Sequence, residues 1–135
     1  MPKNLRSRQT KLKKMEWFLK VLRQYADFNG RARRKEYWMF ILFNMIFGFV
    51  AMLLDNLLGI ADPVIGYGAI YGLYTLALII PGIAVAVRRL HDLGKSGWML
   101  LIAFIPLIGA IWLIVLMCTD SNAGENQYGA NPKEM

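Results

Sequence analysis

Three long stretches without a charged residue constrain this chain more than any other feature. Residues 37–54, 63–87 and 98–119 contain no Asp, Glu, Lys, Arg or His, and they are 18, 25 and 22 residues long. A helix needs about 20 predominantly apolar residues to cross the roughly 30 Å hydrocarbon core of a membrane. The first stretch reaches that length by continuing to Leu58. The sequence therefore predicts an all-α integral membrane protein with three transmembrane helices, at about 37–58, 63–87 and 98–119.

Two other fold classes do not fit this pattern. Three uncharged helices in a soluble domain would have no polar face to turn toward water, and 135 residues are too few to bury all three. A signal peptide is not expected either, because the first apolar run begins only at Tyr37 and exceeds the 7–15 residues of a typical apolar signal core. The single Cys118 and single His91 exclude an intramolecular disulfide and a Cys/His metal site. We expect no metal and no cofactor.

The Lys and Arg residues predict the orientation in the membrane. Twelve of the sixteen lie in residues 1–36, and the predicted loop 59–62 has none. The next loop has Arg88, Arg89 and Lys95, and the tail has only Lys133. Short loops rich in Lys and Arg stay in the cytoplasm. The pattern predicts a cytoplasmic N-terminus and, after three crossings, a C-terminus outside.

The net charge of +7 favours an anionic lipid surface on the cytoplasmic face over nucleic acid as a partner. Lys and Arg next to a membrane are attracted to anionic head groups, whereas nucleic-acid binding needs a free basic face with aromatic stacking partners. The aromatic residues here instead lie where interface anchors are expected. The predicted anchors are Trp17, Tyr37, Trp38 and Trp98.

The segments outside the predicted spans differ in character. Residues 1–14 are basic without periodicity and are predicted to be a disordered lead. Residues 15–28 repeat apolar side chains at helical spacing, which predicts an amphipathic helix lying in the cytoplasmic interface, packed on the ends of the spans, or both. A transmembrane domain at 29–119 and a polar tail at 120–135 complete the organisation.

Charged residues flank the first two spans on what should be the same side of the membrane. Glu36 opens the first span while Arg88 and Arg89 end the second, so we predict carboxylate–arginine pairing between Glu36 and these arginines. Additive effects of Glu36→Ala and Arg89→Ala in a double-mutant cycle would contradict this pairing. Asp92 can pair along its own helix with Arg88 or Arg89. The basic run before the first span is also a plain topology determinant, and lipid phosphates could contact it. The predicted polar cluster or head-group contact comprises Arg31, Arg33, Arg34, Glu36, Arg88, Arg89, His91 and Asp92.

Helix-end and packing signals refine the spans. Asp62-Pro63 is typical of an N-cap and first helical position. Gly68 and Gly72 make a small-residue face suited to close helix packing, so a homo-oligomer or a membrane protein partner is expected. Kinks are predicted at Pro81-Gly82 and between Pro106 and Gly109.

No catalytic constellation is visible in the sequence. His91-Asp92 could serve acid–base chemistry, but no motif ties a nucleophile to it, and neighbouring helical residues point about 100° apart. Asn44 is more typical of a helix–helix hydrogen bond than of an ion ligand. We therefore predict a non-enzymatic accessory or regulatory membrane protein. The alternatives are a subunit of an oligomeric transporter or channel and, less favoured, a membrane enzyme using the His91 region.

Three motifs in order carry a family resemblance. They are FNGRARRKEYW at 28–38, RRLHDLGKSGW at 88–98 and GENQYGANP at 124–132. Together they resemble the DUF805 family, small bacterial inner-membrane proteins of the YhaH/YhaI type, over Met15 to about Pro132. The resemblance implies a bacterial cytoplasmic-membrane protein with no established catalytic residues. It also implies that the natural start could be Met15, which would make residues 1–14 an extension.

The third motif raises an alternative for the tail. By charge the tail lies outside, yet its sequence is too patterned for an idle segment. If it lies in the cytoplasm, it could join the predicted polar cluster, and the count of three spans would then be wrong.

Overall fold

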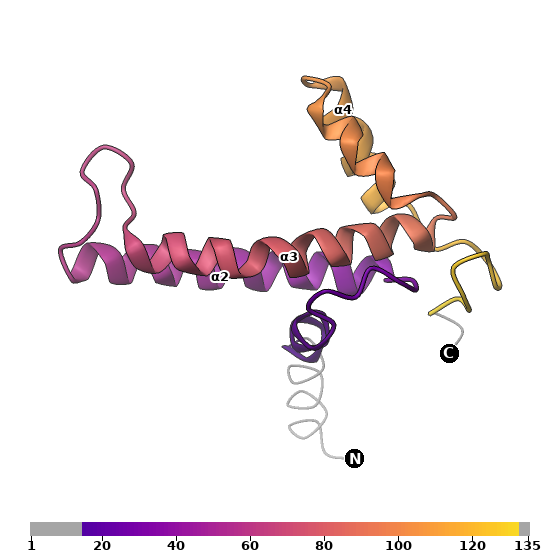
Figure 1. The fold of residues 1–135 in the computed structure, drawn as a ribbon, viewed down its shortest axis with the longest axis horizontal. Helices are drawn as coiled ribbons and strands as arrows, with labels where there is room; N and C mark the ends of the chain where they lie inside the picture. The colour runs from indigo at the N-terminus through magenta and orange to yellow at the C-terminus, as the bar shows by residue number, and fades with distance from the viewer. Residues whose placement is uncertain (1–14, 133–135) are drawn as a thin grey trace, which may run out of the picture.

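Two long helices dominate the computed structural model, which describes residues 15–132. They are α2, Arg34–Leu57, and α3, Ala69–Asp92, of 24 residues each. They run antiparallel, side by side (Figure 1). At 1.5 Å per residue each is about 36 Å long, and both are long and apolar enough to cross a membrane. The described residues contain no strand apart from a single bridge between Asn126 and Gly129. The predicted basic lead, residues 1–14, lies outside the described part of the chain.

The predicted start of the second span is wrong. Asp62 begins a turn, where its Oδ1 accepts hydrogen bonds from the backbone N–H groups of Val64 and Ile65. The helix starts only at Ala69. An aspartate near the end of α2, Asp55, takes the capping role, because its buried carboxylate accepts three N–H groups from the first turn of α3. The donors are Gly68 at 2.8 Å, Ile70 at 3.0 Å and Tyr71 at 3.0 Å.

The predicted third span is not one helix. A 3₁₀ helix, η1, covers Gly97–Phe104, and a short α-helix, α4, covers Ile108–Cys118. Pro106 disfavours helical backbone at Ile105, which is extended, and Leu107 follows with a φ of 61°. A Cβ at Gly109 would lie 1.7 Å from the Ile102 carbonyl oxygen, so only glycine allows this close approach. The predicted kink is therefore a break in the helix.

The chain reverses at that break. Gly97, at the start of η1, packs against Val87 of α3. Asn122, just after α4, donates its backbone N–H to the Asp92 carbonyl at 3.0 Å. Both ends of the η1–α4 hairpin thus lie at the C-terminal end of α3, while its tip is exposed, with Phe104 at 82% and Leu107 at 81%. Each arm is only about 16 Å long. The tail therefore lies at the same end of the long helices as the segment before α2, contrary to the predicted separation (Figure 1).

The N-terminal helix crosses the long pair and ends earlier than predicted. Within the described residues it covers 15–23 and a turn follows, whereas the prediction continued to residue 28. Phe18 and Val21 are buried against a core that includes Phe40 and Val85. Of the two predicted placements, packing on the spans is thus present in the structure. The hairpin packs on a second core, and Figure 1 draws it on the other side of the pair; its buried members are Ala86, Leu90, Leu93, Leu116 and Met117.

Candidate functional site

Asp92 is the centre of a buried ionic cluster at the C-terminal end of α3. Its Oδ1 lies 3.0 Å from Arg31 Nε, and its Oδ2 lies 2.7 Å from Arg89 Nη1. All three side chains are at most 1% exposed. The hydroxyl of Ser121 also donates to Oδ2. One carboxylate therefore neutralises two guanidinium groups that would be very costly to bury without a counter-charge.

Arg31 connects three segments that are distant in the sequence. A guanidinium has five N–H donors, and Arg31 makes five bonds. Besides Asp92 Oδ1 they go to backbone carbonyls: Asp92 at 3.1 Å, Asn122 at 2.8 Å, Gly124 at 2.8 Å and Gly129 at 3.2 Å. The tail is thus held by hydrogen bonds to its main chain. Its turn-rich sequence places those carbonyls around one cation.

Arg89 fastens the hairpin to the same carboxylate. Its Nε and Nη2 lie 3.4 and 3.3 Å from the Met117 carbonyl, and Nη2 also donates to the Thr119 carbonyl. The last carbonyls of a helix have no partner within the helix, so a cation there satisfies them and complements the negative end of the helix dipole. The α3–α4 contact is therefore polar at this end and apolar farther in.

Glu36 organises a second, adjacent part of the cluster. Its Oε1 lies 2.9 Å from Arg88 Nη1 and its Oε2 lies 3.1 Å from Lys20 Nζ. Arg88 Nη1 also donates to Gln24 Oε1 at 2.6 Å. The predicted pairing of Glu36 with the arginines at the end of α3 is present at Arg88, whereas Arg89 binds Asp92 instead. Neighbouring residues on a helix point about 100° apart, so these two arginines face different carboxylates.

His91 is used as a packing and hydrogen-bonding residue in this cluster. Its Nδ1 lies 3.0 Å from the Gly30 carbonyl oxygen, and its ring stacks on Tyr128 with centroids 3.8 Å apart and planes 3° apart. Its own carbonyl accepts from Asn126 Nδ2 at 3.0 Å. One ring face is therefore covered by the tail. The described residues contain no group of three His, Cys, Asp or Glu side chains that could hold a metal ion.

The two remaining predicted members lie at the rim. Arg33 places its guanidinium over the Trp17 ring, 5.3 Å from the centroid, and Arg34 donates to the Cys118 carbonyl at 3.0 Å. The structure thus gathers six of the eight predicted residues in the buried network: Arg31, Glu36, Arg88, Arg89, His91 and Asp92. Whether any of the eight contacts lipid remains a prediction.

The predicted packing glycines and anchors have mixed surroundings. A Cβ at Gly72 would meet nothing within 4 Å, and Gly68 precedes α3 and touches the Ile60 carbonyl in the loop. Within this chain the close approach occurs at Gly48, where a Cβ would lie 3.4 Å from Tyr71.

Among the predicted anchors, Trp98 is 80% exposed. By contrast, the Trp38 indole N–H donates to the Met117 carbonyl at 3.1 Å, and the Tyr37 ring packs edge-on against the Trp38 ring.

Several residues that build the cluster were missed from the sequence. Lys20 and Gln24 lie in the predicted amphipathic segment, and no local feature marks them as partners of Glu36 and Arg88. For the tail, the sequence offers only the motif at 124–132 as a sign that this segment joins the cluster. Nothing in a single sequence says which carbonyls a buried arginine will reach, so the tail contacts required the tertiary structure.

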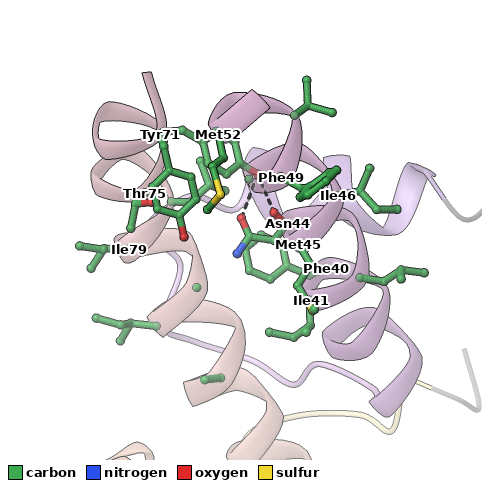
Figure 2. A pocket seen from close by; sticks show the side chains of 18 of the residues that line it. Phe40, Ile41, Asn44, Met45, Ile46, Phe49, Met52, Tyr71, Thr75 and Ile79 are labelled. Carbon is green, nitrogen blue, oxygen red and sulfur yellow. Dashed lines mark hydrogen bonds between the residues drawn. The ribbon is translucent and has the colours of Figure 1, made fainter. Parts of the chain in front are cut away.

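A second candidate site is an open groove of about 1030 Å³ between α2 and α3. Its lining is mostly apolar, and the polar exceptions are Asn44, Thr75 and the hydroxyl groups of Tyr71 and Tyr74. Figure 2 shows Asn44, Tyr71 and Thr75 among the lining side chains. The Tyr74 hydroxyl donates to Asn44 Oδ1 at 2.9 Å. Within the described residues, the Asn44 amide nitrogen and the Thr75 hydroxyl donate to no protein atom, and Figure 2 draws that nitrogen among the groove's side chains.

This arrangement defines a small helical protein whose two longest helices are long and apolar enough to cross a membrane and are held together at one end by buried charges. The chain belongs to the family described as "Protein of unknown function (DUF805)", whose model matches residues 25–130. It is 49% identical over 119 residues to the "Inner membrane protein YhaH" of Escherichia coli K12, covering 88% of this chain and 98% of that one. It is 45% identical to the "Inner membrane protein YhaI" of the same organism, covering 88% and 97%. No solved structure matches the chain. The family and these relatives support the inner membrane as its location.

Proposed function

We propose that this chain is a non-enzymatic accessory or regulatory protein of the inner membrane, acting through protein and lipid contacts. In this proposal α2 and α3 cross the membrane, the η1–α4 hairpin enters from the cytoplasmic side and returns to it, and both ends of the chain are cytoplasmic. The observation that carries it is the set of five hydrogen bonds made by Arg31, which attach the tail and the end of α3 to the segment before α2.

Charge and length support the same topology. Residues 1–36, which end in the first turn of α2, hold twelve of the sixteen Lys and Arg residues, whereas the α2–α3 loop holds none. This is the bias expected of a cytoplasmic and an external side. The two arms of the hairpin are each about half of the roughly 30 Å needed for a crossing. Two crossings and a re-entrant hairpin therefore replace the three crossings expected from hydropathy.

The non-enzymatic role is supported by how the charged groups are used. The carboxylates of Glu36 and Asp92 each bind two cations, and His91 is covered by Tyr128. These groups bind one another and the backbone, so they hold segments together instead of facing a substrate-sized opening. The surfaces left for partners are the basic rim and the α2–α3 groove.

Dual-reporter fusions test the topology. A reporter fused after Met135 should be active in its cytoplasmic form, and one inserted in the loop at Asp62 should be active in its external form. External activity at Met135 would restore the odd number of crossings and overturn the proposal. Purified protein in liposomes should then show no ion or solute flux above that of empty liposomes.

An oligomeric transporter or channel subunit is the second candidate, favoured by the Asn44 amide nitrogen, which donates to no atom of the described residues. Lipid tails offer no acceptor to an N–H donor, whereas the Asn44 carboxamide oxygen of a second copy would. If the groove pairs two copies, Asn44→Leu should lower the oligomer fraction in detergent, measured by light scattering. The control Ile79→Leu lines the same groove without a polar atom and should leave the oligomer unchanged.

A further inference from the structure

A basic pocket lies outside the buried cluster, between the N-terminal helix and the start of α2. It has a volume of about 440 Å³. Four cations and one carboxylate line it, together with an indole: Lys20, Arg23, Arg33, Lys35, Glu16 and Trp17. Lys20 also binds Glu36, the only other carboxylate in contact with these described cations. Even with both acids counted, the positive charges exceed the negative ones by two.

The cations of this pocket are available to a ligand. Within residues 15–132, Arg23, Arg33 and Lys35 form no ion pair, in contrast to the arginines of the buried cluster. Arg33 is oriented by Trp17, because its guanidinium lies 5.3 Å from the centre of the indole ring. A guanidinium beside ammonium groups suits an oxyanion with several acceptor atoms, such as a phosphate.

The start of α2 adds a second attraction for an anion. The N-cap residue is Arg33, and no side chain caps the first turn. The first N–H groups of a helix lack partners within it, and the dipole makes this end positive. Arg34 and Lys35 follow immediately, where cations oppose that dipole. A bound anion would satisfy both the peptide N–H groups and the neighbouring cations.

We propose that this pocket binds the phosphate of an anionic phospholipid head group. The inference rests on the proposed function, in which this end of the spanning helices lies at the cytoplasmic surface. A lipid is favoured over a soluble phosphate because the pocket opens beside the spanning pair. Its neighbours Leu19 and Tyr25 are exposed apolar side chains, 44% and 41%, which can contact acyl chains.

Native mass spectrometry of the full chain, released from neutral-detergent micelles with equal amounts of phosphatidylglycerol and phosphatidylcholine, tests the site. The natural sequence should retain phosphatidylglycerol preferentially. Arg33→Gln with Lys35→Gln should reduce that preference about 30-fold, the effect expected for two cations at an anionic surface. If this double variant unfolds, Arg23→Gln with Lys35→Gln tests the same pocket.

The matched control changes the net charge by the same two units elsewhere. Lys95→Glu does so at a residue that does not line the pocket, and it should keep the preference. An unchanged preference in the pocket variant, or an equal loss in the control, would overturn the site. Displacement of the lipid by excess inorganic phosphate would overturn the lipid as its ligand. The reporter fusions at Met135 and Asp62 test the topology separately, so failure of the pocket is distinguishable from failure of the proposed function.

Discussion

The two ends of the α2–α3 pair bury carboxylates by different means. At one end Glu36 and Asp92 are neutralised by the side chains of Lys20, Arg31, Arg88 and Arg89. At the other end Asp55 is buried with no cation and accepts three backbone N–H groups of α3.

The difference follows from the charge distribution. The loop between α2 and α3 has no Lys or Arg, so peptide dipoles are the positive groups on offer at that end. A helix N-terminus supplies them, both as donors and as the positive end of the dipole. The other end of α3 is a C-terminus, which repels a carboxylate and favours cations. Asp92, the last residue of α3, therefore requires arginines.

Removing the central carboxylate should have the largest effect. Asp92→Ala leaves Arg31 and Arg89 buried without a counter-charge, so the free energy of unfolding should fall by about 3–5 kcal/mol. Denaturation in mixed micelles, followed by tryptophan fluorescence, measures it. Glu125→Ala removes an exposed acid of the tail and should change stability little. Equal losses for the two variants would contradict the central role of Asp92.

The next largest effect should be a difference between the two ends in how much stability they lose on substitution by asparagine. Asp55→Asn retains an acceptor for backbone N–H groups, and Asn caps helices about as well as Asp. It should therefore retain most of the stability that Asp55→Ala loses. Asp92→Asn, which removes the charge that two guanidinium groups need, should retain little. The same denaturation assay compares the four variants. If the Asn variant retained the same share of the stability lost by the Ala variant at both positions, charge would matter equally at the two ends.

A double-mutant cycle should resolve the pairing at the charged end. Glu36→Ala and Arg88→Ala should couple by about 1–3 kcal/mol, because each removes the same 2.9 Å ion pair. Glu36→Ala and Arg89→Ala should be additive to within about 0.5 kcal/mol, since Arg89 binds Asp92. The reverse pattern would show that Glu36 pairs with Arg89 and not with Arg88.

The tail contact should give the smallest change. Tyr128→Leu removes the stack on His91 and should lower stability by about 0.5–1.5 kcal/mol. Limited proteolysis should then cut the tail faster, while the Glu36–Arg88 part stays intact. Tyr67→Leu, which removes an aromatic contact with Tyr71 at the opposite end, is the matched control and should leave the rate of tail cleavage unchanged.

Much of the charged end could be predicted from the sequence, because its residues flank two spans on one side. The exact partners could not, since Arg88 and Arg89 differ by one residue and only the rotation of α3 against α2 decides which carboxylate each meets. Lys20 was unpredictable for a similar reason. Its partner depends on where the N-terminal helix crosses the pair.

The opposite end was predicted less well. Asp62-Pro63 has the composition of a helix start, and Asp55 has no local feature that marks it as a cap. Asp55 and the first turn of α3 are separated by a loop. A capping contact across such a loop leaves no local pattern, because the acceptor comes from a different helix.

The sequence by itself determined that two apolar helices form and that charge gathers at one end. Long uncharged runs must satisfy their backbone groups internally in lipid, and a helix does so without help from the rest of the chain. Only the tertiary structure decided that the third apolar run forms the η1–α4 hairpin and not a third long helix. Hydropathy measures composition, whereas the reversal at Ile105–Leu107 depends on backbone geometry at Pro106 and Gly109. Arg89 then holds α4 beside α3, and Arg31 holds the tail there.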